Sequence, residues 1–336
     1  YFTYDPVWRG GDSAGSIDLG DGRVLWLFGD SVISANSNNS RMGTFVRNSV
    51  AIQKGYYLSG PVKYYWRNLS KGKQAFFSAP GVEWFWPGHG SIVRDRLIVF
   101  LLQLRSSKTG LGFEAVGWYV AIISNPADDP DKWNIRYVRG PNTFGQMAGS
   151  AAVLKDDKYL YAFGSDEPAT HEAHLLRWSL HDVYLGKISK PEWWFNGQWV
   201  KRRSELPKPR PLFVGATEYS VHFDQDLEKF IQIQTFGFGE ASIGLRMADR
   251  LEGPWSEPKI IYTPDYSGVK MPIAYSAKAH PELRGNGLFV TYNVNSLDVK
   301  HMLENQSIYF PRFIRVKIGL LAGPDNEDGK ETVKTR

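Results

Sequence analysis

The stretch GGDSAGSIDLGDGRVLWLFGDS, residues 10–31, decides the fold expected for the rest of the chain. The pair Asp21-Gly22 in its middle is a strong signal for a tight β-hairpin turn between two apolar runs. Asp12 and Asp30 each lie nine residues from Asp21. A hairpin centred on this turn places the two aspartates opposite each other at its open end, where facing Cα atoms are about 4.5–5.5 Å apart.

The same kind of unit recurs along the chain: a small residue, a β run, a charged turn and a second β run. Its five copies cover residues 15–30, 90–104, 149–166, 219–236 and 275–293, and their marker serines (Ser16, Ser91, Ser150, Ser220 and Ser276) are 56 to 75 residues apart. A second hairpin follows each copy. Four strands in each of five repeats predict an all-β chain, a five-bladed β-propeller with four-stranded antiparallel blades.

The predicted blades start near residues 12, 88, 147, 218 and 274. Because no glycine- or proline-rich linker divides the chain, residues 1–336 are expected to form a single domain. The last apolar run, residues 311–319, is expected to close the ring beside the N-terminal segment. A large β-sandwich is the structural alternative, but it would not explain five similar units.

Composition narrows the function. Aromatic residues make up 14% of the chain, including 12 Trp, which favours core packing for most of them and sugar stacking for the rest. The net charge of +5 is scattered, and the one basic cluster, VKRRSELPKPR at residues 200–210, predicts a solvated loop rather than nucleic-acid binding. The absence of cysteine excludes disulfides and thiolate metal sites.

The sequence also gives expectations about location and partners. No apolar run reaches the ~18 residues that a transmembrane helix needs, so no membrane span is expected. The chain begins at Tyr1 without Met, which suggests a removed export signal and a secreted or periplasmic protein. A monomer is expected. No cofactor is required and the His spacing predicts no catalytic metal, although a calcium or sodium ion in the central channel is one option.

In a propeller the first strand of each blade lines the central channel, and residues just before those strands gather at one mouth. The expected mouth residues combine a catalytic pair, a reserve acid and substrate-binding side chains from several repeats. They are Asp12 and Asp30 (catalytic), Glu218 (reserve acid), and Arg47, Asn48, Trp86, His89, Gln146, Tyr275 and Lys278 (substrate binding).

Two carboxylates beside sugar-stacking aromatics point to glycoside hydrolysis. That reaction uses one carboxylic acid to protonate the leaving oxygen and one carboxylate as nucleophile or as base for water. In the alternative interpretation, Asp12 and Asp30 only cap tight Gly-Asp turns through side-chain hydrogen bonds. A non-catalytic glycan-binding propeller, or a propeller glycosidase acting on another polysaccharide, also remains open at this point.

Several segments resemble one known family. WRGGDSAGSIDLGDGRVLWLFGDS (residues 8–31) and FVRNSVAIQ (residues 45–53) are similar to the first blade of the propeller family of endo-acting D-arabinofuranases, long catalogued as a domain of unknown function. Later landmarks are PEWWFNGQWV (residues 191–200), AYSAKAHPEL (residues 274–283) and VTYNVNS (residues 290–296). The resemblance therefore covers most of the chain.

The resemblance implies a propeller hydrolase that cleaves α-D-arabinofuranosyl linkages inside arabinans such as those of mycobacterial cell walls. Its catalytic aspartates would be Asp12, as base or nucleophile, and Asp30, as acid or as the group that tunes the acid, with inversion expected from related propeller furanosidases. An apolar flank of Asp30 would raise its pKa, and Glu218 would be the reserve acid. Ser31 departs from the threonine more usual in this family, a conservative change.

Overall fold

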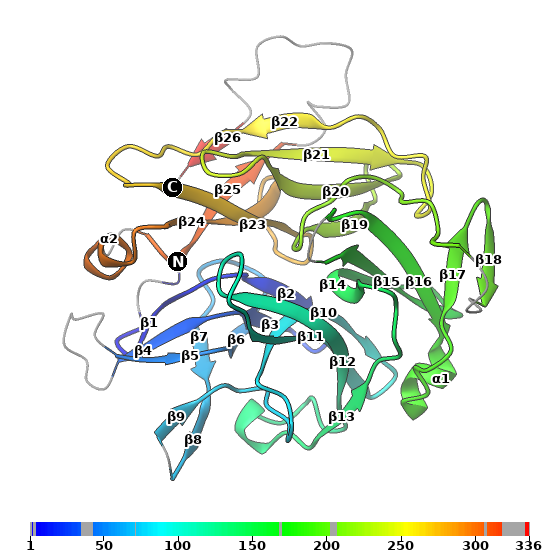
Figure 1. The fold of residues 1–336 in the computed structure, drawn as a ribbon, viewed down its shortest axis with the longest axis horizontal. Helices are drawn as coiled ribbons and strands as arrows, with labels where there is room; N and C mark the ends of the chain where they lie inside the picture. The colour runs from blue at the N-terminus through cyan, green and yellow to red at the C-terminus, as the bar shows by residue number, and fades with distance from the viewer. Residues whose placement is uncertain are drawn as a thin grey trace.

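The computed structural model describes residues 2, 5–34, 43–70, 72–167, 170–201, 207–305, 308–317 and 333–335. These residues form an all-β structure of seven sheets in which every strand pair is antiparallel (Figure 1). The prediction of an all-β chain is confirmed. The expected seam with residues 311–319 falls partly outside the described residues, because 318 and 319 are not among them.

Five sheets follow one another along the chain, each beginning close to a predicted blade start. The first contains β2 (Gly15–Asp18), β3 (Arg23–Phe28), β6 (Ser49–Lys54) and β7 (Val62–Tyr65). The second contains β10 (Trp84–Val93), β11 (Arg96–Ser106), β12 (Phe113–Ile123) and β13 (Ile135–Arg139). The third contains β14 (Gln146–Lys155), β15 (Tyr159–Asp166), β16 (Ala173–Ser179), β17 (Glu192–Phe195) and β18 (Gln198–Lys201).

The fourth sheet contains β19 (Ser220–Asp224), β20 (Lys229–Phe236), β21 (Ser242–Ala248) and β22 (Lys259–Tyr262). The fifth contains β23 (Pro272–His280), β24 (Leu288–Ser296), β25 (Pro311–Val316) and β26 (Val333–Thr335). Two smaller sheets are formed by β1 (Trp8–Gly11), β4 (Ser31–Ser34) and β5 (Gly43–Val46), and by β8 (Arg67–Leu69) and β9 (Gly72–Gln74). The sheets therefore hold two to five strands rather than a uniform four.

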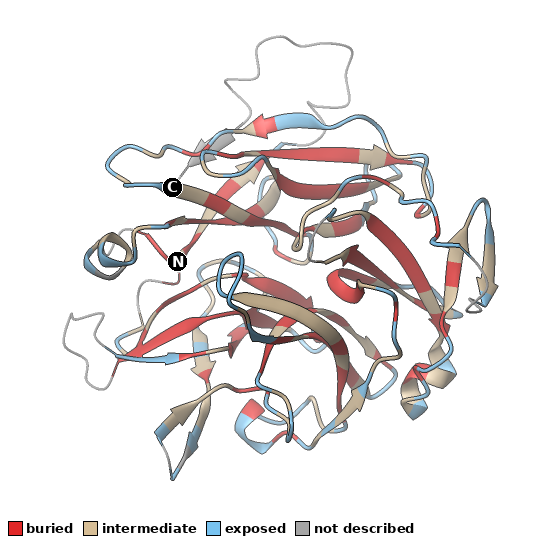
Figure 2. Ribbon diagram, in the orientation of Figure 1, coloured by how far each residue is buried: buried red, intermediate tan, exposed pale blue. Residues whose placement is uncertain are grey.

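The first strands of the five larger sheets surround a common channel. Strand β2 contacts β10, β10 contacts β14, β14 contacts β19, β19 contacts β23, and β23 returns to β2. A cavity of about 510 Å³ lies among these strands. The buried residues concentrate in the inner strands, and exposed ones lie in the outer strands and loops (Figure 2).

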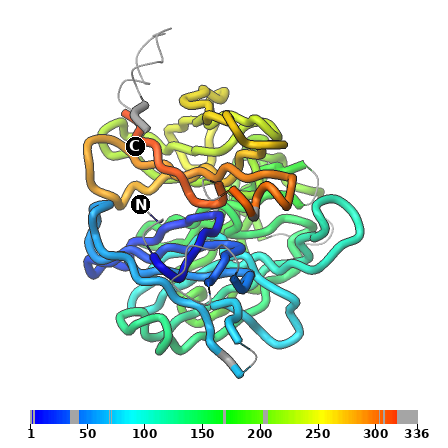
Figure 3. Tube along the Cα trace, turned by 90° about the vertical axis from the view of Figure 1, so that its left-hand side faces the viewer, coloured from blue at the N-terminus to red at the C-terminus, as the bar shows by residue number. Residues whose placement is uncertain are grey.

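The two ends of the described chain meet at the first sheet. Gly11 donates its backbone N–H to the carbonyl of Tyr309 at 3.0 Å, and the ring of Phe2 lies 5.4 Å from that of Phe313 on β25. Figure 3 shows the N-terminal strands next to the C-terminal ones. Strand β25 itself pairs with β24 and β26, so the N-terminal segment joins the last sheet through loop and side-chain contacts.

The hairpin predicted around Asp21 is present. Gly15 pairs with Leu27 and Asp18 with Val24, so the strand register is the one expected for a turn at Asp21. Near the turn, Arg23 binds the Asp21 carboxylate at 2.6 Å. This local pairing leaves the other end of the hairpin free to carry the two aspartates.

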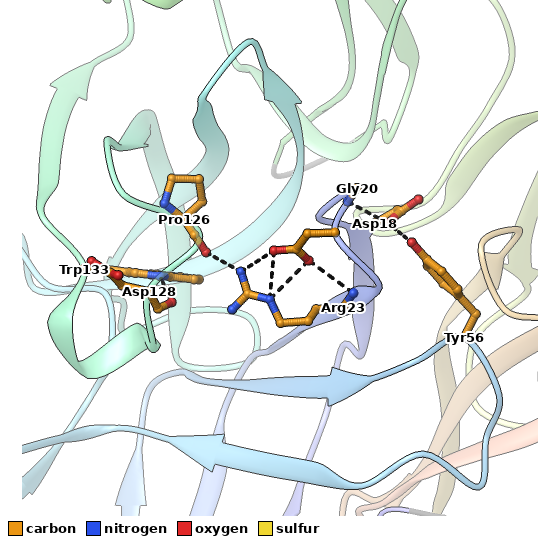
Figure 4. A network of polar contacts seen from close by, with 8 residues as sticks. Asp18, Gly20, Arg23, Tyr56, Pro126, Asp128 and Trp133 are labelled. Atoms are coloured by element: carbon orange, nitrogen blue, oxygen red, sulfur yellow. Dashed lines mark hydrogen bonds and ion pairs between the residues drawn. The ribbon is translucent and has the colours of Figure 1, made fainter.

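The turn is also held by neighbouring loops. Arg23 donates to the Pro126 carbonyl at 2.8 Å, and the Tyr56 hydroxyl donates to Asp18 at 3.0 Å (Figure 4). Asp18 also accepts the backbone N–H of Gly20 at 2.8 Å. The first hairpin is thus fixed at its turn by the adjacent sheet and by the loop after β6, which limits the ways in which its open end can move.

Two helices interrupt the strands. After β16, the chain turns into α1 (Leu180–Leu185), whose Ser179 accepts the N–H of Asp182 as the N-cap and whose Gly186 ends it at φ 75°. Residues 174–186 therefore form the rest of β16 and then α1. The second helix is α2 (Val299–Glu304), and a short 3₁₀ turn covers Pro130–Lys132.

Other sequence expectations have mixed outcomes. The glycine-rich residues 237–244 contain the turn between β20 and β21. Of the basic cluster at 200–210, residues 202–206 lie outside the described residues, and Lys208 forms ion pairs with Asp166 and Glu172 at 2.6 Å. No helix within the described part of the chain is long and apolar enough to cross a membrane.

Candidate active site

The two aspartates meet at the open end of the first hairpin. Asp12 lies between β1 and β2, and Asp30 between β3 and β4. The backbone N–H of Asp12 donates to the Asp30 carbonyl at 3.3 Å, and Gly29 donates to the Asp12 carbonyl at 3.0 Å. The predicted juxtaposition is therefore observed at the backbone, and the charge of Asp30 acts on the Asp12 carboxyl group.

The backbone around Asp12 is shaped to bring its carboxyl group inward. Ser13 and Ala14, which follow it, both adopt positive φ values of 76° and 44°, a conformation that costs about 1–3 kcal/mol per residue outside glycine. Gly29 lies so close that a Cβ added there would be 2.5 Å from Asp12 Oδ1. A side chain at position 29 would therefore displace the Asp12 carboxylate that packs against it.

Asp30 is buried and held by two donors. Trp86 Nε1 donates to Oδ1 at 3.0 Å, and Arg47 donates to Oδ2 at 3.2 Å. Burial raises the pKa of Asp30 to about 6, although the Trp86 and Arg47 contacts lower it. The sequence placed Arg47 and Trp86 among the substrate-binding residues, and the structure places both on this carboxylate.

Asp12 has fewer donors and more negative neighbours. The Tyr275 hydroxyl donates to Oδ2 at 3.0 Å, and the Asn295 amide donates to the same hydroxyl at 3.5 Å. Burial, followed by the charges of Asp30 and Glu218, raises the pKa of Asp12 well above its ordinary value. Burial raises the pKa of both carboxyl groups; the Trp86 and Arg47 contacts lower that of Asp30, whereas the charges of Asp30 and Glu218 raise that of Asp12 further.

Glu218 is part of a separate ionic group beside Asp12. Lys278 Nζ lies 2.7 Å from Glu218 Oε1 and 2.7 Å from Ser13 Oγ, and the Ser13 hydroxyl donates to the same carboxylate oxygen. Burial works against ionisation of Glu218, but the Lys278 ammonium and these hydrogen bonds lower its pKa below the ordinary value. Glu218 is therefore suited to remain ionised rather than to donate a proton as the reserve acid.

Two predicted substrate-binding residues have structural partners instead. Asn48 is fully buried, donates to the carbonyls of Phe77 and Phe85 at 3.0 and 2.9 Å, and accepts the N–H of Phe77 at 2.7 Å. His89 bridges the inner strands, with Nε2 2.9 Å from the Ser16 carbonyl and Nδ1 accepting the Val153 N–H at 3.0 Å. Burial lowers the pKa of His89 to about 4, which keeps this ring neutral.

Gln146, also predicted at the mouth, begins β14 and is buried. Its side-chain amide has no hydrogen-bond partner among the described residues. A buried amide without partners is costly, and such groups are typical of sites that accept a ligand or water. Its predicted role in substrate binding stays a prediction.

Sequence reasoning missed residues contributed by distant segments. Tyr309 donates its hydroxyl to the Asp30 carbonyl at 3.0 Å while its own carbonyl accepts from Gly11. Ser13 was not singled out, although it follows Asp12 directly. These two residues are identified only by long-range contacts between the first and last sheets. No local sequence motif marks either of them.

Most of the tryptophans lie in the interior, as expected. All twelve are described; seven are buried, the other five are half-buried and none is exposed. Among the described residues, the exposed aromatic side chains are instead Phe45, Tyr57, Phe144, Phe223 and Phe238. The most exposed aromatic faces are therefore those of phenylalanine and tyrosine, and the half-buried tryptophans are partly exposed beside them.

No group of three or more side chains suited to a metal ion occurs within the described ranges. The channel does contain histidine side chains that remain uncharged. Burial, together with the charge of Lys278, lowers the pKa of His280 well below its ordinary value. A calcium or sodium ion in the channel stays a prediction. Without one, the two carboxyl groups can serve as a general acid that protonates a leaving oxygen and a carboxylate that activates water or attacks carbon.

Comparison with known proteins supports the fold. The family described as "Domain of unknown function (DUF5005)" matches residues 1–318. No curated protein matches the chain. A solved structure from Bacteroides ovatus, provisionally named as a hydrolase, is 17% identical with a TM-score of 0.73 and covers 93% of this chain and 86% of its own.

Two further solved structures are more distant. The Cellvibrio cellulosa alpha-L-arabinanase complexed with arabinohexaose is 9% identical, has a TM-score of 0.54, and covers 97% of this chain and 95% of its own. The GH43_1 enzyme from Xanthomonas citri complexed with xylose is 13% identical, has a TM-score of 0.51, and covers 98% of this chain and 92% of its own. At these identities the likeness concerns the fold.

Proposed function

Since the chain belongs to the DUF5005 family, whose description assigns no activity, we propose a function from the site itself: the protein is a glycoside hydrolase. The single observation that carries this proposal is the facing of Asp12 and Asp30, two carboxyl groups whose surroundings raise both pKa values by unequal amounts. Glycosidic cleavage needs one protonated and one ionised carboxyl group at the same pH.

The electrostatics favour a definite division of roles. Asp12, with the more strongly held proton, is the general acid that protonates the leaving oxygen. Asp30, with a pKa of about 6 and an arginine partner, is the ionised base or nucleophile. This is the reverse of the roles implied by the family resemblance, and it follows from the donors that each carboxylate has.

Glu218 assists rather than reacts. Its carboxylate is paired with Lys278, and its negative charge is one of the causes that raise the pKa of Asp12. Tyr275 orients the Asp12 carboxyl group from the other side through its hydroxyl. Both are positioning residues in this proposal, and Lys278 balances the charge of the group.

The proposed substrate is a furanosidic arabinan, cut internally at D-arabinofuranosyl linkages. Support comes from the first-hairpin motif, residues 8–31, and from solved structures of similar fold that hold arabinohexaose and xylose, both built from pentoses. We further propose that the five larger sheets are the blades of a propeller, because their first strands contact one another in a ring. We also propose that the protein is a monomer that acts on polysaccharide outside the cytoplasm.

A panel of soluble polysaccharides tests this function. D-arabinan, L-arabinan, galactan and xylan are each incubated with the protein, and released oligosaccharides are separated by chromatography. The expected result is short oligomers from D-arabinan, with free arabinose late or absent. Rapid release of monomer would contradict internal cleavage, cutting of another polymer would contradict the linkage, and glycan binding without turnover would favour a non-catalytic glycan-binding protein.

A further inference from the structure

A second cavity lies beside β5 of the small β1–β4–β5 sheet and includes Arg47, which binds Asp30. It has a volume of about 280 Å³ and is lined by residues 45–47, 73–75, 77–79 and 82–84. This volume lies just below the ~300 Å³ at which pockets for drug-sized ligands begin. The cavity is thus the right size for one small ring or one short part of a longer ligand.

Arg47 connects this cavity to the reaction centre. Its guanidinium donates to Asp30 at 3.2 Å and lies 4.3 Å from the centroid of the Trp84 ring and 5.7 Å from that of Phe45. The side chain remains 43% exposed. Because residues two apart in a strand face the same side, Trp84 and the Asp30 donor Trp86 project from β10 together.

The lining has the chemistry of a sugar subsite. Phe45 is 47% exposed, which is unusual for a large aromatic side chain and leaves a ring face available for the C–H face of a sugar. Arg47 has Asp30 as its counter-charge, and Lys73 is accompanied by Glu83 in the same lining. Within the lining Glu83 offsets the charge of Lys73, and Arg47 is paired with Asp30, which lies outside the lining; this balance suits an uncharged polyhydroxylated ligand better than an anion.

We propose that this Phe45–Arg47–Trp84 cavity is a subsite for a sugar unit of the same glycan chain, one or two units away from the bond that Asp12 and Asp30 cleave. The inference rests on the proposed glycosidase function and deepens it. It names Phe45 as a residue that makes cleavage depend on chain length, and Arg47 as the side chain shared by the subsite and Asp30. A subsite beside the scissile bond is what cleavage within a chain requires.

The test compares long and short substrates. Oligosaccharides of two to six units, prepared from the polymer that the wild-type protein cuts best, are used to measure kcat/KM as a function of length. Phe45→Ala is expected to lower the ratio of kcat/KM for the longest over the shortest cleaved oligosaccharide by about tenfold, equivalent to ~1.4 kcal/mol. Phe45→Trp, which restores an aromatic face, is expected to recover most of the ratio.

Phe238→Ala is the matched control, because Phe238 is 72% exposed on the turn between β20 and β21 and outside the cavity. It should leave the ratio unchanged. Binding of the hexasaccharide to Asp12→Asn, with and without Phe45→Ala, is measured by calorimetry and should weaken about tenfold with the second change. If the wild-type protein cleaves the ladder but Phe45→Ala alters neither the ratio nor the binding, the subsite is wrong; if no glycan is cleaved or bound, the proposed function itself fails.

Discussion

Replacing Gly29 by alanine tests whether catalysis depends on the position of the Asp12 carboxylate. The added Cβ would lie 2.5 Å from Asp12 Oδ1, whereas ordinary contact begins at 3.4 Å, so the oxygen must move by about 0.9 Å (3.4 − 2.5). Misplacing a catalytic group by about 1 Å can cost ~10²-fold in rate. We therefore expect kcat/KM to fall about 100-fold, equivalent to roughly 2.7 kcal/mol of transition-state stabilisation.

The assay is initial-rate hydrolysis of the best glycan by wild type, Gly29→Ala and Gly15→Ala. Gly15 lies on the same hairpin, but a Cβ there would meet its nearest atom, the Gly88 carbonyl oxygen, at 3.4 Å, so this variant should remain active. The melting temperature of Gly29→Ala should stay close to wild type, because the displaced atom ends a flexible side chain. Wild-type kcat/KM in Gly29→Ala would refute the catalytic placement of Asp12.

Four further outcomes follow from the site. Asp12→Asn and Asp30→Asn should each lower turnover by at least 10²–10⁴-fold without unfolding the protein. Aryl glycosides with a good leaving group should restore the turnover of Asp12→Asn only, because they need no general acid. The profile of kcat/KM against pH should rise through about 6 as Asp30 ionises, and it should fall at higher pH as Asp12 loses its proton. Arg47→Met removes a cation that lowers the pKa of Asp30, so the acidic limb of this profile should move to higher pH. Glu218→Gln removes a charge that raises the pKa of Asp12, so the basic limb should move to lower pH, and an unchanged limb would contradict its positioning role. Asn48→Ala should lower the free energy of unfolding by about 1–3 kcal/mol or more, because it leaves buried carbonyl and N–H groups unpaired, while activity per folded molecule persists in the same glycan assay.

The parts of the fold that were predicted are those encoded locally. The hairpin around Asp21 follows from a turn dipeptide and the alternation beside it, and its register in the structure is the predicted one. The five larger sheets begin within four residues of the starts predicted from small residues before β runs, although β10 begins at Trp84 rather than near 88. The extra sheet of β1, β4 and β5 was not predicted, because β1 and β4 are each four residues long and pair through irregular register.

The part of the site that was predicted is the part that lies on the first hairpin. Asp12 and Asp30 face each other because of one register, which the sequence reveals. The partners that set their acidity come from other segments: Tyr275 lies 263 positions from Asp12, and Tyr309 lies 279 positions from Asp30. Asn48 shows the opposite case. It was predicted to bind substrate beside Arg47, but its side-chain amide is hydrogen-bonded to backbone groups of residues 77 and 85.

The joining of the first and last sheets has a consequence for synthesis of the protein. The hairpin that carries both aspartates leaves the ribosome early, but Tyr275, which orients Asp12, is 263 residues further along the chain. At about 5–20 residues per second, that interval is roughly 13–53 s. Until the end of this interval the nascent chain holds two acidic side chains without Tyr275 and Lys278, although Glu218 is already synthesised. Under the proposed function, hydrolytic activity therefore arises only when the final sheet docks, and its appearance during refolding would time that docking.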